Sequence, residues 1–158
     1  QEPDVLFRIR AELFAAQAGL AANAESRDPA IIAALHDGVA LLARIASVED
    51  ASVGDYITVR RGISILIARL AGADYIARLS AALEREVAQL WASVMHPDRR
   101  RRSAATWARL VKAVANSRVG EAERLGRDLI LDGLAEVQRR AELSEDPPSP
   151  SPKRRSRC

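Results

Sequence analysis

Cysteine and histidine are nearly absent from this chain of 158 residues, and their scarcity excludes several kinds of site. Cys158 is the only cysteine and the last residue, so a single chain can build neither a disulfide framework nor a thiolate metal site. His36 and His96 lie far apart, and neither has a metal-ligating neighbour at suitable spacing except Asp37, which points to another helix face. We expect both histidines to be structural or surface residues.

Glycine-rich phosphate loops and nucleophile arrangements are missing as well. The eight glycines do not cluster into a phosphate-binding motif, and no Ser/His/Asp arrangement is suggested. The sequence therefore predicts no catalytic residue and no cofactor, and we expect that the protein is not an enzyme.

Long hydrophobic runs and a basic body are also lacking. No apolar run approaches the roughly 18 residues of a membrane span, and the first residues do not resemble a signal peptide, so we expect a cytoplasmic protein. The net charge of +3 comes from the end of the chain, where four basic residues lie within Lys153–Arg157. The rest carries 20 basic and 21 acidic groups, which is unlike the basic stripe of a nucleic-acid-binding domain. We expect the basic end to be solvated rather than bound to a nucleic-acid backbone.

The residues that are abundant are aliphatic and favour helices. Only six residues are aromatic, so the core must consist of Leu, Ile, Val and Ala. Apolar residues recur at helical spacing in six segments with short connections, which predicts an all-α fold, an antiparallel bundle of about six helices. The segments cover approximately residues 3–22, 28–48, 52–72, 74–95, 98–116 and 119–143.

The first segment carries two neighbouring stripes at helical spacing. One is aliphatic and consists of Leu6, Ile9, Leu13, Ala16 and Leu20. In the second, Arg10 stands between Phe7 and Phe14, which suggests a partly enclosed guanidinium.

Two stretches next to these helices have unusual compositions. Residues 144–158 are rich in Pro, Ser and basic residues and cannot form a core, so we expect a disordered tail after a domain that covers residues 1–143. Arg99 to Arg102 place four cations at a helix N-terminus, where they oppose the helix dipole. Such a run could grip a phosphate, a partner domain or DNA, but we expect a solvated helix start.

Four stretches at the ends and junctions of the predicted helices have distinctive sequences. They are LFRIRAELFAAQAGLAA (6–22), ISILIARLAGADYI (63–76), ARLSAALEREVAQLW (77–91) and WARLVKAVANSRVGEAERLGRDLI (107–130). In this order and spacing they resemble the FCD domain, the C-terminal domain of FadR-type GntR transcription regulators. The resemblance covers about residues 1–143, and because each phrase is degenerate it rests on their order.

The resemblance implies a sensing role. In that family the helical bundle forms a homodimer and holds a small effector, often a carboxylic acid, while a winged helix-turn-helix domain reads operator DNA. No such DNA-binding domain is expected within residues 1–158, and because the chain starts with Gln1 rather than Met we expect it to be part of a longer protein. The alternative is a helical protein–protein interaction module without a ligand. The sequence indicates neither the effector, nor the operator, nor activation as against repression.

Many members of the family bind a divalent metal through an Asp and a His four residues apart and two further histidines. The resemblance places these four positions at Arg60, Ser64, Trp107 and Leu129. None is a metal ligand of the required type, and Arg60 brings a positive charge to the place of the carboxylate. We therefore expect no metal.

A cationic anchor could replace the metal. Arg60 and Ser64 are one turn apart on one helix face, and the resemblance directs that face toward Trp107 and Leu129. Arg10 could supply a second guanidinium, and a guanidinium binds a carboxylate bidentately. These five residues are the predicted effector contacts.

A buried Arg60 would need an anionic partner, either a ligand or an internal acid such as Asp55 or Glu121. In the alternative reading, Trp107 and Leu129 fill the pocket, Arg60 turns to solvent, and the domain only dimerises.

Overall fold

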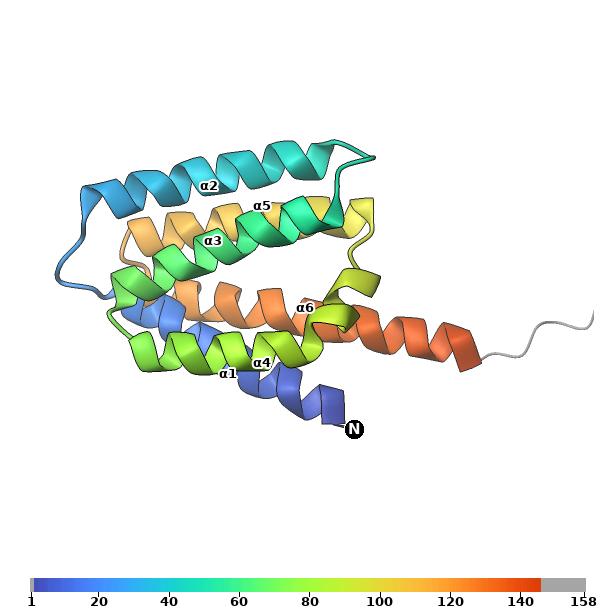
Figure 1. Cartoon of the computed structure of the whole chain (residues 1–158). Helices are drawn as coiled ribbons and strands as arrows, with labels where there is room; N and C mark the ends of the chain where they lie inside the picture. Colours follow the sequence, from blue (N-terminus) through green and yellow to red (C-terminus); the bar gives the residue numbers. More distant parts are fainter. Residues whose placement is uncertain (1, 146–158) are drawn as a thin grey trace, which may run out of the picture.

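The structure, a computed structural model, describes residues 2–145 and consists of six α-helices (Figure 1). Within that range no strand occurs, so the predicted all-α bundle is confirmed. The helices are α1 (Glu2–Ala22), α2 (Pro29–Ser47), α3 (Val53–Ala71), α4 (Asp74–Ser93), α5 (Pro97–Ala115) and α6 (Val119–Glu145).

Local sequence signals place the helix ends close to their predicted positions. The Asp28 carboxylate caps α2 by accepting a hydrogen bond of 2.9 Å from the backbone N–H of Ala30. Gly72 ends α3 in the left-handed region, at φ 62°, which glycine adopts without a steric penalty. α4 ends at Ser93, slightly earlier than predicted, and the short connection that follows leads into Pro97 at the start of α5.

His96 provides the N-cap of α5. Its Nδ1 accepts a hydrogen bond of 3.3 Å from the backbone N–H of Arg99, and its Nε2 lies 3.2 Å from the Glu136 carboxylate. With Nδ1 as the acceptor, Nε2 is the ring nitrogen that can donate to the Glu136 carboxylate. His36 is exposed, so the structure places one histidine on the surface and the other at a helix end.

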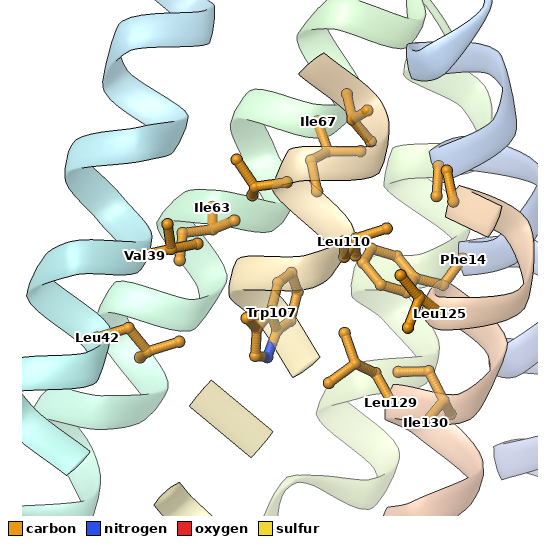
Figure 2. Close-up of a cluster of buried hydrophobic side chains, with 14 of the residues drawn as sticks. Phe14, Val39, Leu42, Ile63, Ile67, Trp107, Leu110, Leu125, Leu129 and Ile130 are labelled. Atoms are coloured by element: carbon orange, nitrogen blue, oxygen red, sulfur yellow. The ribbon is translucent and has the colours of Figure 1, made fainter. Parts of the chain in front are cut away.

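The helices lie in three layers (Figure 1). α2 forms the outer layer and packs on α3 and α5, while α1, α4 and α6 lie on the other side of these two helices. In Figure 2, Trp107 and Leu110 of α5 lie between the apolar side chains of α2 and α3 and those of α1 and α6. The labelled neighbours are Val39, Leu42, Ile63, Ile67, Phe14, Leu125, Leu129 and Ile130.

Of the two predicted stripes of α1, the structure buries the second and leaves much of the aliphatic one exposed. Ile9 and Leu20 are each 45% exposed, whereas Phe7, Arg10 and Phe14, the predicted second stripe, are buried. The reason is close packing against α6, on which α1 makes its most extensive contacts. At Gly126 of α6 an added Cβ would lie 3.4 Å from the α1 backbone, so the small residues of α1, not its large aliphatic ones, face this helix.

The arginine run at the start of α5 is only half solvated, which corrects the expectation for Arg99 and Arg100. Arg101 and Arg102 are exposed, but Arg99 is 4% and Arg100 2% exposed. Arg100 donates to backbone carbonyls of the α2–α3 connection, at 2.7 Å to Ala51 and 2.9 Å to Glu49. Arg100 thus ties α5 to the connection between α2 and α3, where carbonyls beyond the end of α2 have no helical partner.

A second arginine joins two helix ends that sequence reasoning did not connect. Arg27 donates from Nη1 to the carbonyls of Ala21 and Ala22 at the end of α1. Its Nη2 donates to those of Val114 and Ala115 at the end of α5, at 2.5 and 3.2 Å. One cation therefore donates hydrogen bonds to the free carbonyl groups of two helix C-termini and places a positive charge near the negative end of each helix dipole.

Two expectations, one about apolar segments and one about the end of the last helix, also change. α2 is, by length and composition, apolar enough to cross a membrane, although a single helix of this kind is weak evidence because core helices pass the same test. Ser144 and Glu145, expected in the tail, are the last residues of α6. The remainder of the predicted tail, residues 146–158, lies outside the described residues.

Candidate functional site

A cavity of about 490 Å³ lies between α1, α3 and α4, with α5 and α6 behind it. Its wall combines apolar side chains with charged ones of both signs. Five arginines face only two carboxylates around it. The lining residues are Arg10, Phe14, Gln17, Arg60, Arg61, Ser64, Ile65, Ala68, Arg69, Asp74, Ala77, Ser80, Ala81, Glu84, Arg85, Trp107 and Ile130.

Helical spacing brings the polar groups of the inner wall together. Arg10, Phe14 and Gln17 follow one another at four and three residues along α1, and Arg60 and Ser64 lie one turn apart on α3. Arg10 is 6%, Gln17 3% and Arg60 5% exposed, so these groups lie in the interior and not at the rim.

Arg60 is held by an internal carboxylate. Its Nη2 donates to Oε1 of Glu84 on α4 at 2.6 Å, and the side chains of the pair are 6% and 17% exposed. Burial lowers the pKa of Arg60, and the Glu84 charge acts against that shift. The expectation of a buried arginine with an acidic partner is confirmed, but the partner is neither Asp55, which is exposed, nor Glu121, which pairs with Arg118 at 3.0 Å.

Arg10 has no such partner. Among the described residues, its Nε and Nη1 have no hydrogen-bond acceptor, although both atoms are inaccessible to solvent. Burial, together with the like charge of Arg60, lowers the pKa of Arg10 to about 10, although the nearby Glu84 charge acts against this shift. The guanidinium is therefore still charged at neutral pH. A buried cation with unused donors on the wall of a cavity is an arrangement that an anion would complete.

Trp91 of α4, which no sequence pattern singled out, organises the arginines. The guanidinium carbons of Arg60 and Arg99 each lie 4.7 Å from the centre of its ring, and that of Arg10 lies at 5.8 Å. An indole face attracts cations, and the attraction grows when water is excluded. Gly133 of α6 leaves room for this ring, because an added Cβ would lie 2.7 Å from it.

The cavity wall contains further polar atoms without partners. Among the described residues, Oε1 of Gln17, Nε of Arg60 and Oγ of Ser80 are buried and make no hydrogen bond. Buried polar groups in folded proteins are nearly always paired, so a cluster of unpaired ones around a cavity suggests an occupant. Gln17 could have been found from the sequence, because it continues the face of Arg10 and Phe14 two turns further along α1.

Four of the five predicted effector contacts line this cavity. Arg10, Arg60, Ser64 and Trp107 are among its lining residues, whereas Leu129 is not. Leu129 packs in the apolar cluster around Trp107 and borders a separate, smaller cavity of about 270 Å³ between α5 and α6 (Figure 2). The adjacent Ile130 takes the place at the main cavity that Leu129 was expected to have.

The four residues predicted to stand at the family's metal positions do not fit a divalent ion. Arg60 is a cation, Trp107 and Leu129 offer no suitable donor, and Ser64 has only a neutral hydroxyl. Within residues 2–145, no three His, Cys, Asp or Glu side chains are grouped so that they could hold a metal ion.

Comparison with known proteins agrees with this architecture. The family model of the FCD domain matches residues 5–132, which is most of the chain. No curated protein and no solved structure matches at a significant level. The chain belongs to the FCD-domain family, the C-terminal domain of GntR-family regulators.

Proposed function

We propose that this domain senses a small organic anion, a carboxylate, without a metal, and does so as part of a GntR-type transcription regulator. Arg10 carries the proposal, because it is buried on the cavity wall with Nε and Nη1 unpartnered among the described residues. A carboxylate placed there would accept hydrogen bonds from the guanidinium and neutralise it.

The rest of the cavity suits such a ligand. Phe14, Trp107 and Ile130 provide an apolar wall for its carbon chain. Arg60 is already paired with Glu84, so it contributes positive potential and its unpaired Nε, not a free guanidinium. Exposed arginines near the opening, Arg61, Arg69 and Arg85, add to the attraction of anions from solvent.

Dimerisation and DNA contact are proposed by analogy with the FCD-domain family. We propose a homodimer in the bacterial cytoplasm, in which operator DNA is contacted by a winged helix-turn-helix domain that is not within residues 1–158. Ligand binding would change how the paired domains sit on their half-sites. The alternative, an interaction module with a filled pocket, is not favoured, because the cavity remains open and Arg60 is buried.

Thermal unfolding in the presence of a panel of small carboxylates tests the proposal. A ligand at 100 times its Kd should stabilise the domain by about 2.7 kcal/mol. Arg10→Met should lose this effect, while Arg8→Met, at an exposed position of the same helix, should keep it. If no carboxylate raises the melting temperature, or if Arg10→Met responds as the wild type does, the proposal is wrong.

A further inference from the structure

Gln17 sets a second requirement for the ligand of the cavity, in addition to the negative charge that Arg10 requires. Its side chain lines the cavity and is 3% exposed. Nε2 donates a hydrogen bond of 3.2 Å to the backbone carbonyl oxygen of Ser64 on α3. Oε1 is buried and has no partner among the described residues.

Chemistry fixes which end of this amide is unpaired. A backbone carbonyl can only accept a hydrogen bond, so the group that faces Ser64 must be the NH₂ of Gln17. Exchanging the amide oxygen and nitrogen would place two acceptors against each other. The free atom is therefore an acceptor, and it needs a donor.

An anionic group cannot satisfy this acceptor, because a carboxylate has no proton to donate at neutral pH. The donor must come from another part of the ligand. An ammonium group would be repelled, since five arginines and only two carboxylates line the cavity. A neutral hydroxyl group meets both conditions.

We propose that the ligand of this cavity is a hydroxylated carboxylate, with its carboxylate on Arg10 and its hydroxyl donating to Oε1 of Gln17. This inference rests on the proposed function and specifies its ligand class. Gln17 is the residue that distinguishes a hydroxy acid from the corresponding unsubstituted acid, because an acid without the hydroxyl leaves the buried oxygen unpaired.

The test compares matched pairs of acids that differ only in one hydroxyl. Arg10 and Gln17 are separated by about 10 Å along the axis of α1, so the panel must vary the hydroxyl position. Suitable pairs are lactate and propionate, 3-hydroxybutyrate and butyrate, 4-hydroxybutyrate and butyrate, and 6-hydroxyhexanoate and hexanoate. Calorimetric titration of the wild-type protein gives the ratio of Kd values for each pair.

In at least one pair the hydroxylated acid should bind about tenfold more tightly than its partner, the factor expected when a buried acceptor gains its hydrogen bond. Gln17→Met, of similar length, should reduce that ratio to about twofold or less and still bind the unsubstituted acid. Arg10→Met should lose both acids. A readout that needs no variant is the side-chain amide signal of Gln17 in ¹⁵N NMR, which the hydroxylated acid should shift more than its partner.

The possible failures are distinguishable. If acids bind through Arg10 but the wild type shows no preference within any pair, the hydroxyl assignment is wrong and the proposed function stands. A preference that persists in Gln17→Met, without a shift of the Gln17 amide signal, also overturns it. If no acid binds at all, the proposed function fails and this inference fails with it.

Discussion

Replacing Arg10 by Met should stabilise the ligand-free protein, although it removes a side chain that we place at the centre of the site. Arg10 is 6% exposed, and its guanidinium has two donors without acceptors among the described residues. Met has a similar length and no charge, so it can fill the same space without the cost of burying a cation.

The magnitude follows from the pKa. Lowering the pKa of Arg10 from its ordinary value to about 10 corresponds to roughly 3 kcal/mol of destabilisation of the charged form. Met loses the attraction to the Trp91 ring, which at a separation of 5.8 Å contributes roughly 1 kcal/mol. The net gain should be about 2 kcal/mol, or roughly 4–8 °C in Tm for a domain of this size.

Arg60 provides the matched comparison with the opposite sign. Arg60→Met would leave the Glu84 carboxylate, 17% exposed, without its ion-pair partner, and should cost roughly 2 kcal/mol. Adding Glu84→Leu to that variant should recover most of the loss. Urea unfolding followed by circular dichroism at neutral pH measures all the variants in the same way. If Arg10→Met destabilises the protein by as much as Arg60→Met, the guanidinium is paired in a way that the structure does not show, and our reasoning about the site is refuted.

Three further predictions concern other parts of the bundle. Gly133→Ala should destabilise the protein by about 1–2 kcal/mol and shift tryptophan fluorescence, because the added Cβ would meet Trp91 at 2.7 Å. Gly62→Ala, where a Cβ meets nothing within 4 Å, should instead stabilise the protein by roughly 0.5–1 kcal/mol. Equal effects of the two substitutions in urea unfolding would contradict the packing argument. Arg27→Met should cost about 2 kcal/mol in the same assay because two helix C-termini lose their donor, and an unchanged midpoint would show that water replaces it. Hydrogen bonds from Arg139 and then His96 hold the pKa of Glu136 below its ordinary value, so its carboxylate stabilises the fold above about pH 4.5 and this contribution is lost as the pH falls through the lowered pKa. Acid unfolding curves should therefore be shallower for Glu136→Gln than for the wild type, and parallel curves would refute this.

Local patterns predicted the helices well because each signal acts within one segment. Asp28 before a proline and Gly72 after an apolar run determine helix ends by their own hydrogen bonds and backbone preferences. Arg10 between two phenylalanines was expected to be enclosed, and it is buried.

Contacts between distant segments were harder to predict. Glu84 pairs with Arg60 only because α4 crosses the cavity opposite α3, and no spacing within either helix indicates that crossing. Which of the two stripes of α1 is buried could not be read from the sequence for a similar reason, since the proximity of α6 at Gly126 favours small residues over large aliphatic ones. The resemblance placed Leu129 at the cavity, whereas Ile130 lines it. An error of one position is enough to miss the site, because neighbouring side chains on a helix differ in direction by about 100°.

Titration of the wild-type protein and of Arg10→Met with the same carboxylate, in buffer freed of divalent cations by a chelating resin, tests the central claim most directly. We predict that the wild-type protein binds without added metal and that Arg10→Met, though more stable, shows at least a tenfold weaker affinity because a charge-assisted hydrogen bond is lost. Binding that appears only when a divalent metal is restored, or that is unchanged in Arg10→Met, would contradict the account of a metal-free site anchored by a buried arginine.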